Sequence, residues 1–330
     1  ILQERENISL DILALSNSQK MMLSEDNIDL KSASNVTEKI EALEQSNTNE
    51  MINHISRRSA YGHIIIDCSA SDEAPDEYGN IFENGISIVT ANKKGLSGNI
   101  DRYKSIMNAK NLNEADFLYE TTAGAALPFV KSVSDIASSS DSIKKIEGVF
   151  SGTLAYLFNS YDASMPFSEL VNDALQQGFT EPDPRDDLSG MDVARKLVIL
   201  AREMGLDMNV NDIHVESLVD PNHLSLSVNE YLEAMSSGDQ AMNDRYQNAL
   251  ENNEKLSYVA QIDENGNASV SLKNLSNDHS FFSLKGTENI IAIHSDYYSN
   301  YPLVLRGPGA GREVTASGLF FDLLSIIRAQ

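Results

Sequence analysis

A loop rich in carboxylates and prolines leads into a predicted helix at residues 178–196, GFTEPDPRDDLSGMDVARK. Asp192 and Lys196 are four residues apart, so both side chains project from one face of that helix. Together with Glu181 in the loop, they could hold an amino acid and supply a proton. Two structural roles fit the same spacing. Ser189 and Asp192 match an S-x-x-D capping box, and Asp192 and Lys196 match a surface ion pair.

A second candidate is the sequence TANKK at residues 90–94, which follows a predicted strand. Ligands of open α/β sheets bind at the carboxyl ends of the strands. Lys93 could therefore meet a carboxylate, a phosphate or a developing alkoxide. The alternative is a solvated loop lysine, because most lysines are exposed.

Two turns rich in small residues are candidate ion sites. The sequence ETTAGAALP at residues 120–128 supplies backbone carbonyl oxygens, which suit a hard cation. It also fits a crowded strand-to-helix turn. The sequence GPGAG at residues 307–311 can form an anion-binding nest of N–H groups before the last helix, although such turns are common.

Composition and residue types exclude several classes of function. A net charge of -24 repels phosphate backbones and anionic membranes, so we predict neither nucleic acid nor a lipid surface as a partner. The longest apolar runs are too short to span a bilayer. Cys68 is the one cysteine, which rules out a disulfide within the chain and favours the cytoplasm; we interpret it as a core residue. The six histidines lack the spacing of a zinc site.

Strands and helices alternate in the first 120 residues. The predicted strands cover residues 8–15, 63–68, 86–90 and 116–120, and the predicted helices cover residues 72–84 and 100–110, with one surface helix within 31–60. This alternation predicts a parallel, doubly wound α/β domain. The run HIIIDC at residues 63–68 is typical of a strand buried on both faces. Ser71 or Asp72 is the expected cap of the next helix, and Gly85 its end.

The pattern after residue 120 predicts a mixed α+β domain. We expect strands at residues 144–150, 290–294 and 303–306, strand-rich segments at 208–219 and 255–274, and helices at 155–158, 191–204 and 314–327. The helix at 191–204 has an apolar face formed by Val193, Leu197, Leu200 and Ala201.

No G-x-G-x-x-G turn opens the chain, although this turn normally follows the first strand of a dinucleotide-binding domain. Residues 1–6 look like the end of a helix, and residues 8–15 look like the second strand. We therefore expect that the first strand and the glycine loop are missing from this sequence.

These segments together resemble homoserine dehydrogenases, most closely the dehydrogenase part of bifunctional aspartokinase–homoserine dehydrogenases. TEPDPRDDLSGMDVARK is similar to that family's signature over its whole length, and DCSAS, TANKK, LVLRGPGAG and VTASG occur in the expected order. The resemblance covers essentially the whole chain. It implies a partial, Rossmann-like NAD(P)-binding domain at residues 1–122, a substrate-binding and dimerisation domain at 123–302, and a segment at 303–330 that returns to the first domain.

The resemblance implies reduction of L-aspartate 4-semialdehyde to L-homoserine, in threonine and methionine biosynthesis. Lys196 matches the proposed proton donor, with Lys93 and Asp192 as its catalytic partners. The remaining assignments are substrate contacts at Glu181, Asp192 and Gly178, cofactor contacts at Lys93, Gly311, Ser69 and Asn17, and a monovalent cation, usually sodium, at Glu120, Ala123, Ala125 and Leu127. Ala123 and Ala126 depart from the valine and glycine that are usual there, but carbonyl ligands tolerate such changes.

The expected cofactor is NADP, with NAD as the alternative. No acidic residue ends the predicted second strand, where an NAD-selective carboxylate would sit. Ser16, Asn17, Ser18 and Lys20 stand there and can accommodate a 2′-phosphate.

The resemblance also implies a homodimer through the central domain, or a tetramer. Three competing functions remain open. They are another semialdehyde or amino acid dehydrogenase on the same fold, a truncated and inactive dehydrogenase domain with a regulatory or assembly role, and an amino acid sensor that binds threonine or homoserine without turnover.

Overall fold

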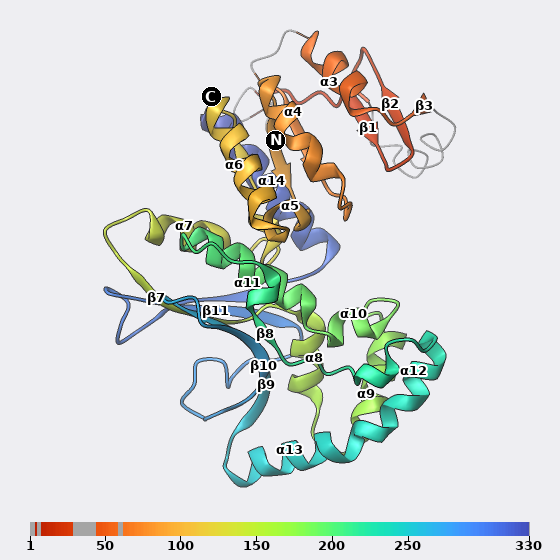
Figure 1. The fold of residues 1–330 in the computed structure, drawn as a ribbon, viewed down its shortest axis with the longest axis vertical. Helices are drawn as coiled ribbons and strands as arrows, with labels where there is room; N and C mark the ends of the chain where they lie inside the picture. The colour runs from red at the N-terminus through yellow and green to blue at the C-terminus, as the bar shows by residue number, and fades with distance from the viewer. Residues whose placement is uncertain (1–3, 5–7, 29–43, 59–61, 330) are drawn as a thin grey trace.

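The computed structural model describes residue 4 and residues 8–28, 44–58 and 62–329. A three-stranded parallel sheet occupies the upper part of the molecule (Figure 1) and has the order β4-β5-β6. The strands of this sheet and the helices between them are, in chain order, β4 (Ile64–Asp67), η2 (Ala74–Glu77), α4 (Tyr78–Glu83), β5 (Ser87–Thr90), α5 (Lys94–Ser97), α6 (Ile100–Leu112) and β6 (Phe117–Leu118). The predicted alternation and parallel pairing are confirmed.

The predicted boundaries of the first helical segment are confirmed in part, because the N-terminal cap residue of η2 is Glu73, which forms no side-chain cap. The Ser71 hydroxyl accepts hydrogen bonds from the N–H groups of Glu73 and Ala74, both at 3.1 Å, where η2 begins. Gly85 adopts a φ of 69° directly after α4, a conformation that favours glycine.

The predicted second strand of the parallel sheet is wrong. Residues 8–13 are not in a strand, and β1 (Ala14–Ser16) pairs antiparallel with β2 (Lys20–Leu23), which pairs with β3 (Glu44–Gln45) in a separate sheet. The reason is local: the Asn17 side chain accepts hydrogen bonds from the N–H groups of Gln19 and Lys20, which closes a hairpin. Helix α3 (Thr48–Ser56) agrees with the predicted surface helix. The helix end predicted at residues 1–6 lies mostly outside the described residues, as do residues 29–43 and 59–61.

Strand β4 is less buried than predicted. It is an edge strand of its sheet, the Ile66 side chain is 44% exposed, and Cys68 is exposed. The expectation that Cys68 is a core residue is therefore wrong. An apolar run predicts a strand, but burial depends on whether other elements cover both of its faces.

A six-stranded sheet with the order β12-β11-β7-β9-β10-β8 forms the centre of the second part. Its strands are β7 (Ile143–Val149), β8 (His214–Val215), β9 (Lys255–Asp263), β10 (Ala268–Leu275), β11 (Glu288–Ser295) and β12 (Leu303–Pro308). Only the β8–β10 pair is parallel. The strand-rich prediction for residues 208–219 is largely wrong, because a capping box between Asn209 and Asp212 forms the turn η4 (Val210–Asp212) there.

Helices cover one face of this sheet, and α8, α11 and α13 pack against β9. The short helix η3 (Glu120–Thr122) follows β6 in the upper part, and the helices of the second part are α7 (Phe129–Ala137), α8 (Gly152–Ser160), α9 (Phe167–Gln176), α10 (Pro184–Leu188), α11 (Met191–Glu203), η5 (Pro221–His223), α12 (Val228–Ala234), η6 (Met235–Gly238) and α13 (Asp239–Glu251). The apolar face predicted for α11 is confirmed, since Val193, Leu197, Leu200 and Ala201 are buried.

The C-terminal segment predicted at 303–330 is divided between the two parts. β12 remains in the central sheet beside β11, whereas α14 (Arg312–Ala329) packs against β5 and η3 in the upper part (Figure 1). Leu319 and Ile326 form an apolar cluster with Val89. The described residues include no helix with the length and apolar character needed to cross a membrane.

Candidate active site

Three predicted catalytic residues meet where the two parts of the chain join. Lys93 lies in the short loop between β5 and α5, while Asp192 and Lys196 lie in the first turns of α11. Asp192 Oδ2 is 2.8 Å from Lys196 Nζ, and Asp192 Oδ1 is 3.4 Å from Lys93 Nζ. Lys196 Nζ also donates a hydrogen bond to the carbonyl oxygen of Phe150 at 2.7 Å. One carboxylate therefore bridges two ammonium groups.

The two lysines hold Asp192 in its ionised form. Burial raises the pKa of this carboxyl, but the charges of Lys196 and Lys93 outweigh that effect and keep the pKa below its ordinary value. The side chain of Lys196 is 12% exposed and that of Asp192 is 41% exposed, so the cluster is sheltered but reachable. Two positive charges facing one negative charge can stabilise a developing oxyanion.

Gly190 determines how α11 begins. It has a φ of 72° and is the N-terminal cap residue, without a side-chain cap, so the capping box expected from Ser189 and Asp192 is not formed. A Cβ at position 190 would lie 2.1 Å from Tyr258 Oη, which donates a hydrogen bond to the carbonyl oxygen of Glu216 at 2.6 Å. Only glycine fits both the turn and the close approach to β9. This leaves Asp192 free to pair with the lysines.

The loop that carries Glu181 is held by two residues that the sequence prediction missed. Asp187 Oδ2 accepts a hydrogen bond from the Glu181 N–H at 2.8 Å, and the Thr153 hydroxyl donates to the carbonyl oxygen of Phe179 at 2.7 Å. Burial raises the pKa of Asp187. The Glu181 side chain itself is exposed. Two features of the sequence could have indicated these residues. Asp187 is one of two adjacent acids at residues 186–187, and Thr153 lies at the start of the helix that follows β7.

Gly178 ends α9 with a φ of 74°, and its N–H donates to the carbonyl oxygen of Leu175. A Cβ at this position would meet no atom within 4 Å, so its side is open. Glycine is required here by the backbone conformation rather than by lack of space.

The glycine turn between β12 and α14 lies against the start of α8. A Cβ at Gly152 would be 3.4 Å from Ala310 Cβ, and a Cβ at Gly309 would be 2.1 Å from the fully buried side chain of Asn289. Gly311 has a φ of 116° and open space beside it. One side of the turn is therefore packed against β11 and α8, and the side at Gly311 can admit a ligand to the N-terminus of α14.

The predicted cofactor residues are only partly brought together. Ser69 lies in the turn after β4, where its hydroxyl accepts a hydrogen bond from Asn92, the neighbour of Lys93. Asn17 lies in the hairpin of the separate N-terminal sheet, and no hydrogen bond or ion pair between described residues joins it to the others.

The carboxylate of Glu120 binds the N-terminus of helix α7. It accepts hydrogen bonds from the N–H groups of Val130 and Lys131, at 2.8 and 2.9 Å, at the start of α7. The Glu120 N–H donates to Asp322 Oδ2 of α14 at 3.0 Å. Burial raises the pKa of Glu120 to about 7 and that of Asp322 to about 6. Asp322 was missed by the sequence prediction, although an acid within an apolar helix is a signal of a buried partner.

The loop at residues 120–128 provides backbone carbonyl oxygens. Gly124 and Ala125 have positive φ values of 90° and 54°. The backbone hydrogen bonds of this loop among the described residues end on the carbonyl oxygens of Glu120, Gly124 and Leu127, and none ends on that of Ala123, which is fully buried, or of Ala125. No group of three His, Cys, Asp or Glu side chains suited to a metal ion occurs in the described residues. A cation here would therefore depend on carbonyl ligands.

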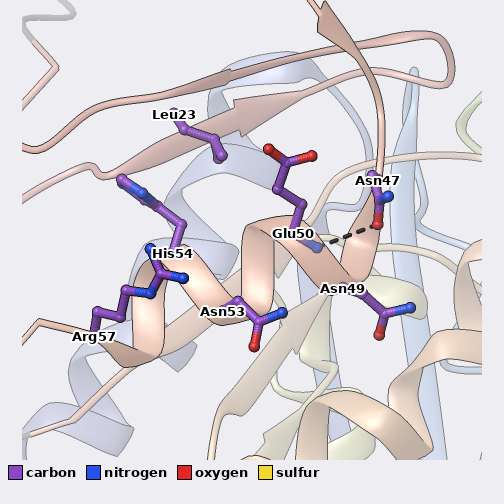
Figure 2. Close-up of a pocket in the computed structure, with 7 residues that line it drawn as sticks. All are labelled: Leu23, Asn47, Asn49, Glu50, Asn53, His54 and Arg57. Carbon is purple, nitrogen blue, oxygen red and sulfur yellow. Dashed lines mark hydrogen bonds between the residues drawn. The ribbon is translucent and has the colours of Figure 1, made fainter.

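A polar pocket lies apart from these residues, beside α3 (Figure 2). Its lining residues are Leu23, Asn47, Asn49, Glu50, Asn53, His54 and Arg57. Within it, the Asn47 side chain accepts a hydrogen bond from the Glu50 N–H at 3.2 Å as the cap of α3. None of the predicted site residues lines this pocket.

Comparison with known families gives two matches that together span most of the chain. The family model for homoserine dehydrogenase matches residues 128–324, and the model for the homoserine dehydrogenase NAD-binding domain matches residues 1–120. Bifunctional aspartokinase/homoserine dehydrogenase 1, chloroplastic, from Zea mays is 39% identical to 99% of this chain. The chain spans 36% of the length of that relative.

Solved structures share the fold. A Candida auris protein of unknown function has a TM-score of 0.87 and 33% identity, with 97% of this chain and 91% of that chain covered. A hyperthermophilic archaeal homoserine dehydrogenase in complex with NADPH has a TM-score of 0.75, with 100% of this chain and 92% of that chain covered. Its identity of 21% supports the fold alone.

Proposed function

The chain belongs to the homoserine dehydrogenase family, and on that basis we propose that it reduces L-aspartate 4-semialdehyde to L-homoserine with a nicotinamide cofactor. The observation that carries the proposal is the bridge from Lys93 through Asp192 to Lys196. It joins the carboxyl end of β5, where ligands of such sheets bind, to the helix of the family signature.

A reduced nicotinamide, when bound, supplies the hydride that reaches the aldehyde carbon. Lys196 donates the proton to the aldehyde oxygen, either directly or through a water molecule. Lys93 stabilises the negative charge that develops on that oxygen. Asp192 orients the substrate and holds both ammonium groups on one side of the site. Glu181, exposed at the loop edge, binds the substrate ammonium group.

The proposed cofactor is NADP, with NAD as the alternative. The open backbone at Gly311, at the N-terminus of the 18-residue helix α14, suits an anionic phosphate. The choice of NADP over NAD rests on the sequence analysis alone, because residues 14–16 form an antiparallel hairpin strand and not a strand of the parallel sheet. Ser69 would contact the cofactor from the turn after β4, whereas the assignment of Asn17 rests on its sequence position alone.

We also propose a monovalent cation, Na⁺, bound by the carbonyl oxygens of Glu120, Ala123, Ala125 and Leu127. Supporting this, the carbonyl oxygens of Ala123 and Ala125 accept no backbone hydrogen bond from described residues, and buried carbonyl groups normally have partners. Activity in buffers without alkali cations should fall and recover with added NaCl. Equal activity in tetramethylammonium buffer would contradict this site.

A homodimer would form through the sheet face opposite the helices. Lys145 and Glu147 of β7 lie on that face, with Nζ and Oε1 2.6 Å apart, and His294 Nε2 of β11 is 3.7 Å from Glu147 Oε2. The Glu147 side chain is 12% exposed. Sedimentation velocity should show a dimer or tetramer.

The proposed compartment is the cytoplasm, although the relative from Zea mays is named chloroplastic.

The decisive experiment is NADP⁺-dependent oxidation of homoserine by the whole polypeptide, followed at the nicotinamide absorbance. Lys196→Met should lower kcat by at least about 100-fold, because it removes the proton donor. The matched control is Lys131→Met, since Lys131 forms an exposed (i, i+4) pair with Asp135 at 2.9 Å. It should retain full activity. Full activity of Lys196→Met would overturn the proposal, and absence of turnover in the folded wild type would favour an inactive domain.

A further inference from the structure

We propose that Tyr78, Asp67 and Asn92 form a buried network that positions Lys93, so that Tyr78 and Asn92 are positioning residues for the reduction. The inference rests on the proposed function for its catalytic consequence. Its structural content, a defined location of the Lys93 amine, can be measured separately.

The network begins at Tyr78, whose side chain is 1% exposed. Its ring packs in edge contacts with Phe82 and Phe117, at 6.5 and 5.6 Å between centroids. Its hydroxyl donates a hydrogen bond to Asp67 Oδ2 at 2.6 Å and lies 3.1 Å from the Thr90 hydroxyl. Burial and the carboxylate of Asp67 both raise the pKa of Tyr78, so the hydroxyl keeps its proton and remains a donor.

Asp67 and Thr90 are the last residues of the paired strands β4 and β5. The second oxygen of Asp67 accepts the Ser69 N–H at 2.7 Å, which shapes the turn after β4. Tyr78 therefore reaches from α4 to the carboxyl ends of both strands, where the Lys93 loop and the Ser69 turn begin.

Asn92 joins these two loops and is 1% exposed. Its Nδ2 donates to Asp67 Oδ2 at 3.2 Å, to the carbonyl oxygen of Ser71 at 2.9 Å and to Ser69 Oγ at 3.3 Å. Its N–H donates to Thr90 Oγ1 at 2.9 Å, and its Oδ1 accepts the Lys94 N–H at 2.9 Å.

Lys93 is thus the residue between two anchored positions. Both its neighbours, Asn92 and Lys94, take part in the network, while its own side chain, 31% exposed, extends to Asp192. No other polar contact of Lys93 Nζ is formed among the described residues. Its location consequently depends on a backbone held by Asn92 and Asp67, and an error of about 1 Å in such a group can lower a rate by about 100-fold.

Tyr78→Phe tests the network, because it removes only the hydroxyl and keeps the packed ring. Tyr119→Phe is a matched control from the same aromatic cluster. Its ring centroid lies 5.0 Å from that of Phe117, and its hydroxyl donates to Glu203 Oε1 at 2.6 Å, the distance found for Tyr78 and Asp67. Each variant loses one hydrogen bond to a carboxylate, and Tyr78→Phe also loses the contact with the Thr90 hydroxyl, so both should lose thermal stability.

Their effects on catalysis should differ. Tyr78→Phe should lower kcat for homoserine oxidation by roughly 10- to 100-fold with a smaller change in KM, and Asn92→Ala should lower it at least as much. Tyr119→Phe should stay within about twofold of the wild type. If Tyr78→Phe and Tyr119→Phe have equal kcat, Tyr78 is only structural and the inference fails, while the proposed function stands.

A second measurement does not require turnover. Reductive ¹³C-methylation of lysine amines preserves their charge and gives each a separate NMR signal. The Lys93 signal, assigned by its absence in Lys93→Arg, should move in Tyr78→Phe and remain in place in Tyr119→Phe. An unmoved Lys93 signal in a folded Tyr78→Phe would overturn the inference, whether or not the wild type oxidises homoserine.

Discussion

Arg202 should determine how firmly the two halves of the active site are held together. It lies in the last turn of α11, is 6% exposed, and stacks on the ring of Tyr103 at 4.7 Å. Its guanidinium donates to the carbonyl oxygens of Met208, Leu96 and Gly98. Leu96 and Gly98 follow Lys93 in the chain, so this one side chain ties the helix of Asp192 and Lys196 to the segment of Lys93.

The perturbation is Arg202→Met, which keeps a long apolar side chain and removes the donors. Three carbonyl oxygens lose their partner at about 1 kcal/mol each, and the lost stacking on Tyr103 adds about 1 kcal/mol. The total is about 4 kcal/mol. At a slope of about 2 °C per kcal/mol, which suits a long chain, the melting temperature should fall by roughly 8 °C. Because Lys93 would be less firmly placed against Asp192, kcat should fall as well.

The assay is thermal unfolding followed by circular dichroism, together with homoserine oxidation. Lys104→Met is the matched control, because Lys104 forms an ion pair with Asp207 across the same junction, but both side chains are more than half exposed. Such pairs contribute about 0–1 kcal/mol. A melting temperature for Arg202→Met within about 2 °C of the wild type would refute the reasoning, as would an equal loss in Lys104→Met.

Three further predictions concern other parts of the site. The folded-state pKa of Asp322 is raised to about 6, so the stability of the wild type should fall as pH rises from about 4 to about 6. Asp322→Asn should remove that fall in thermal melts recorded at each pH. Parallel plots of melting temperature against pH for the variant and the wild type would contradict this. Gly190→Ala should destabilise by about 1–3 kcal/mol in chemical denaturation, and the added change Tyr258→Phe should recover part of it; no recovery would exclude the clash as the cause. Asp187→Asn should raise KM for homoserine more than it lowers kcat, because Asp187 holds the Glu181 loop, and an unchanged KM would argue against that role.

Local patterns determined much of the fold and one part of the site. The alternation of apolar strands with helices predicted the β4-β5-β6 sheet, and the helical spacing of Val193, Leu197 and Leu200 predicted the buried face of α11. The pair of Asp192 and Lys196 followed from their separation of four residues. These features depend on neighbours in the chain, which a single sequence displays.

Strand pairing and burial were decided by tertiary structure. Residues 14–16 are extended, partly as predicted, but the turn at Asn17 directs them into an antiparallel hairpin. Strand periodicity is similar for both kinds of pairing, so it could not distinguish them. In the same way, the apolar run before Cys68 indicated a strand but not its place at the edge of a sheet.

The contacts that complete the site join residues far apart in the chain. Lys93 meets Asp192, Asp322 meets Glu120, and Asn92 meets Asp67 only because the sheet, α11 and α14 are packed together. The sequence by itself determined which chemical groups are present and which elements carry them. Their distances, and the pKa values of the buried carboxyl groups, follow from packing and burial, which exist only in the folded chain.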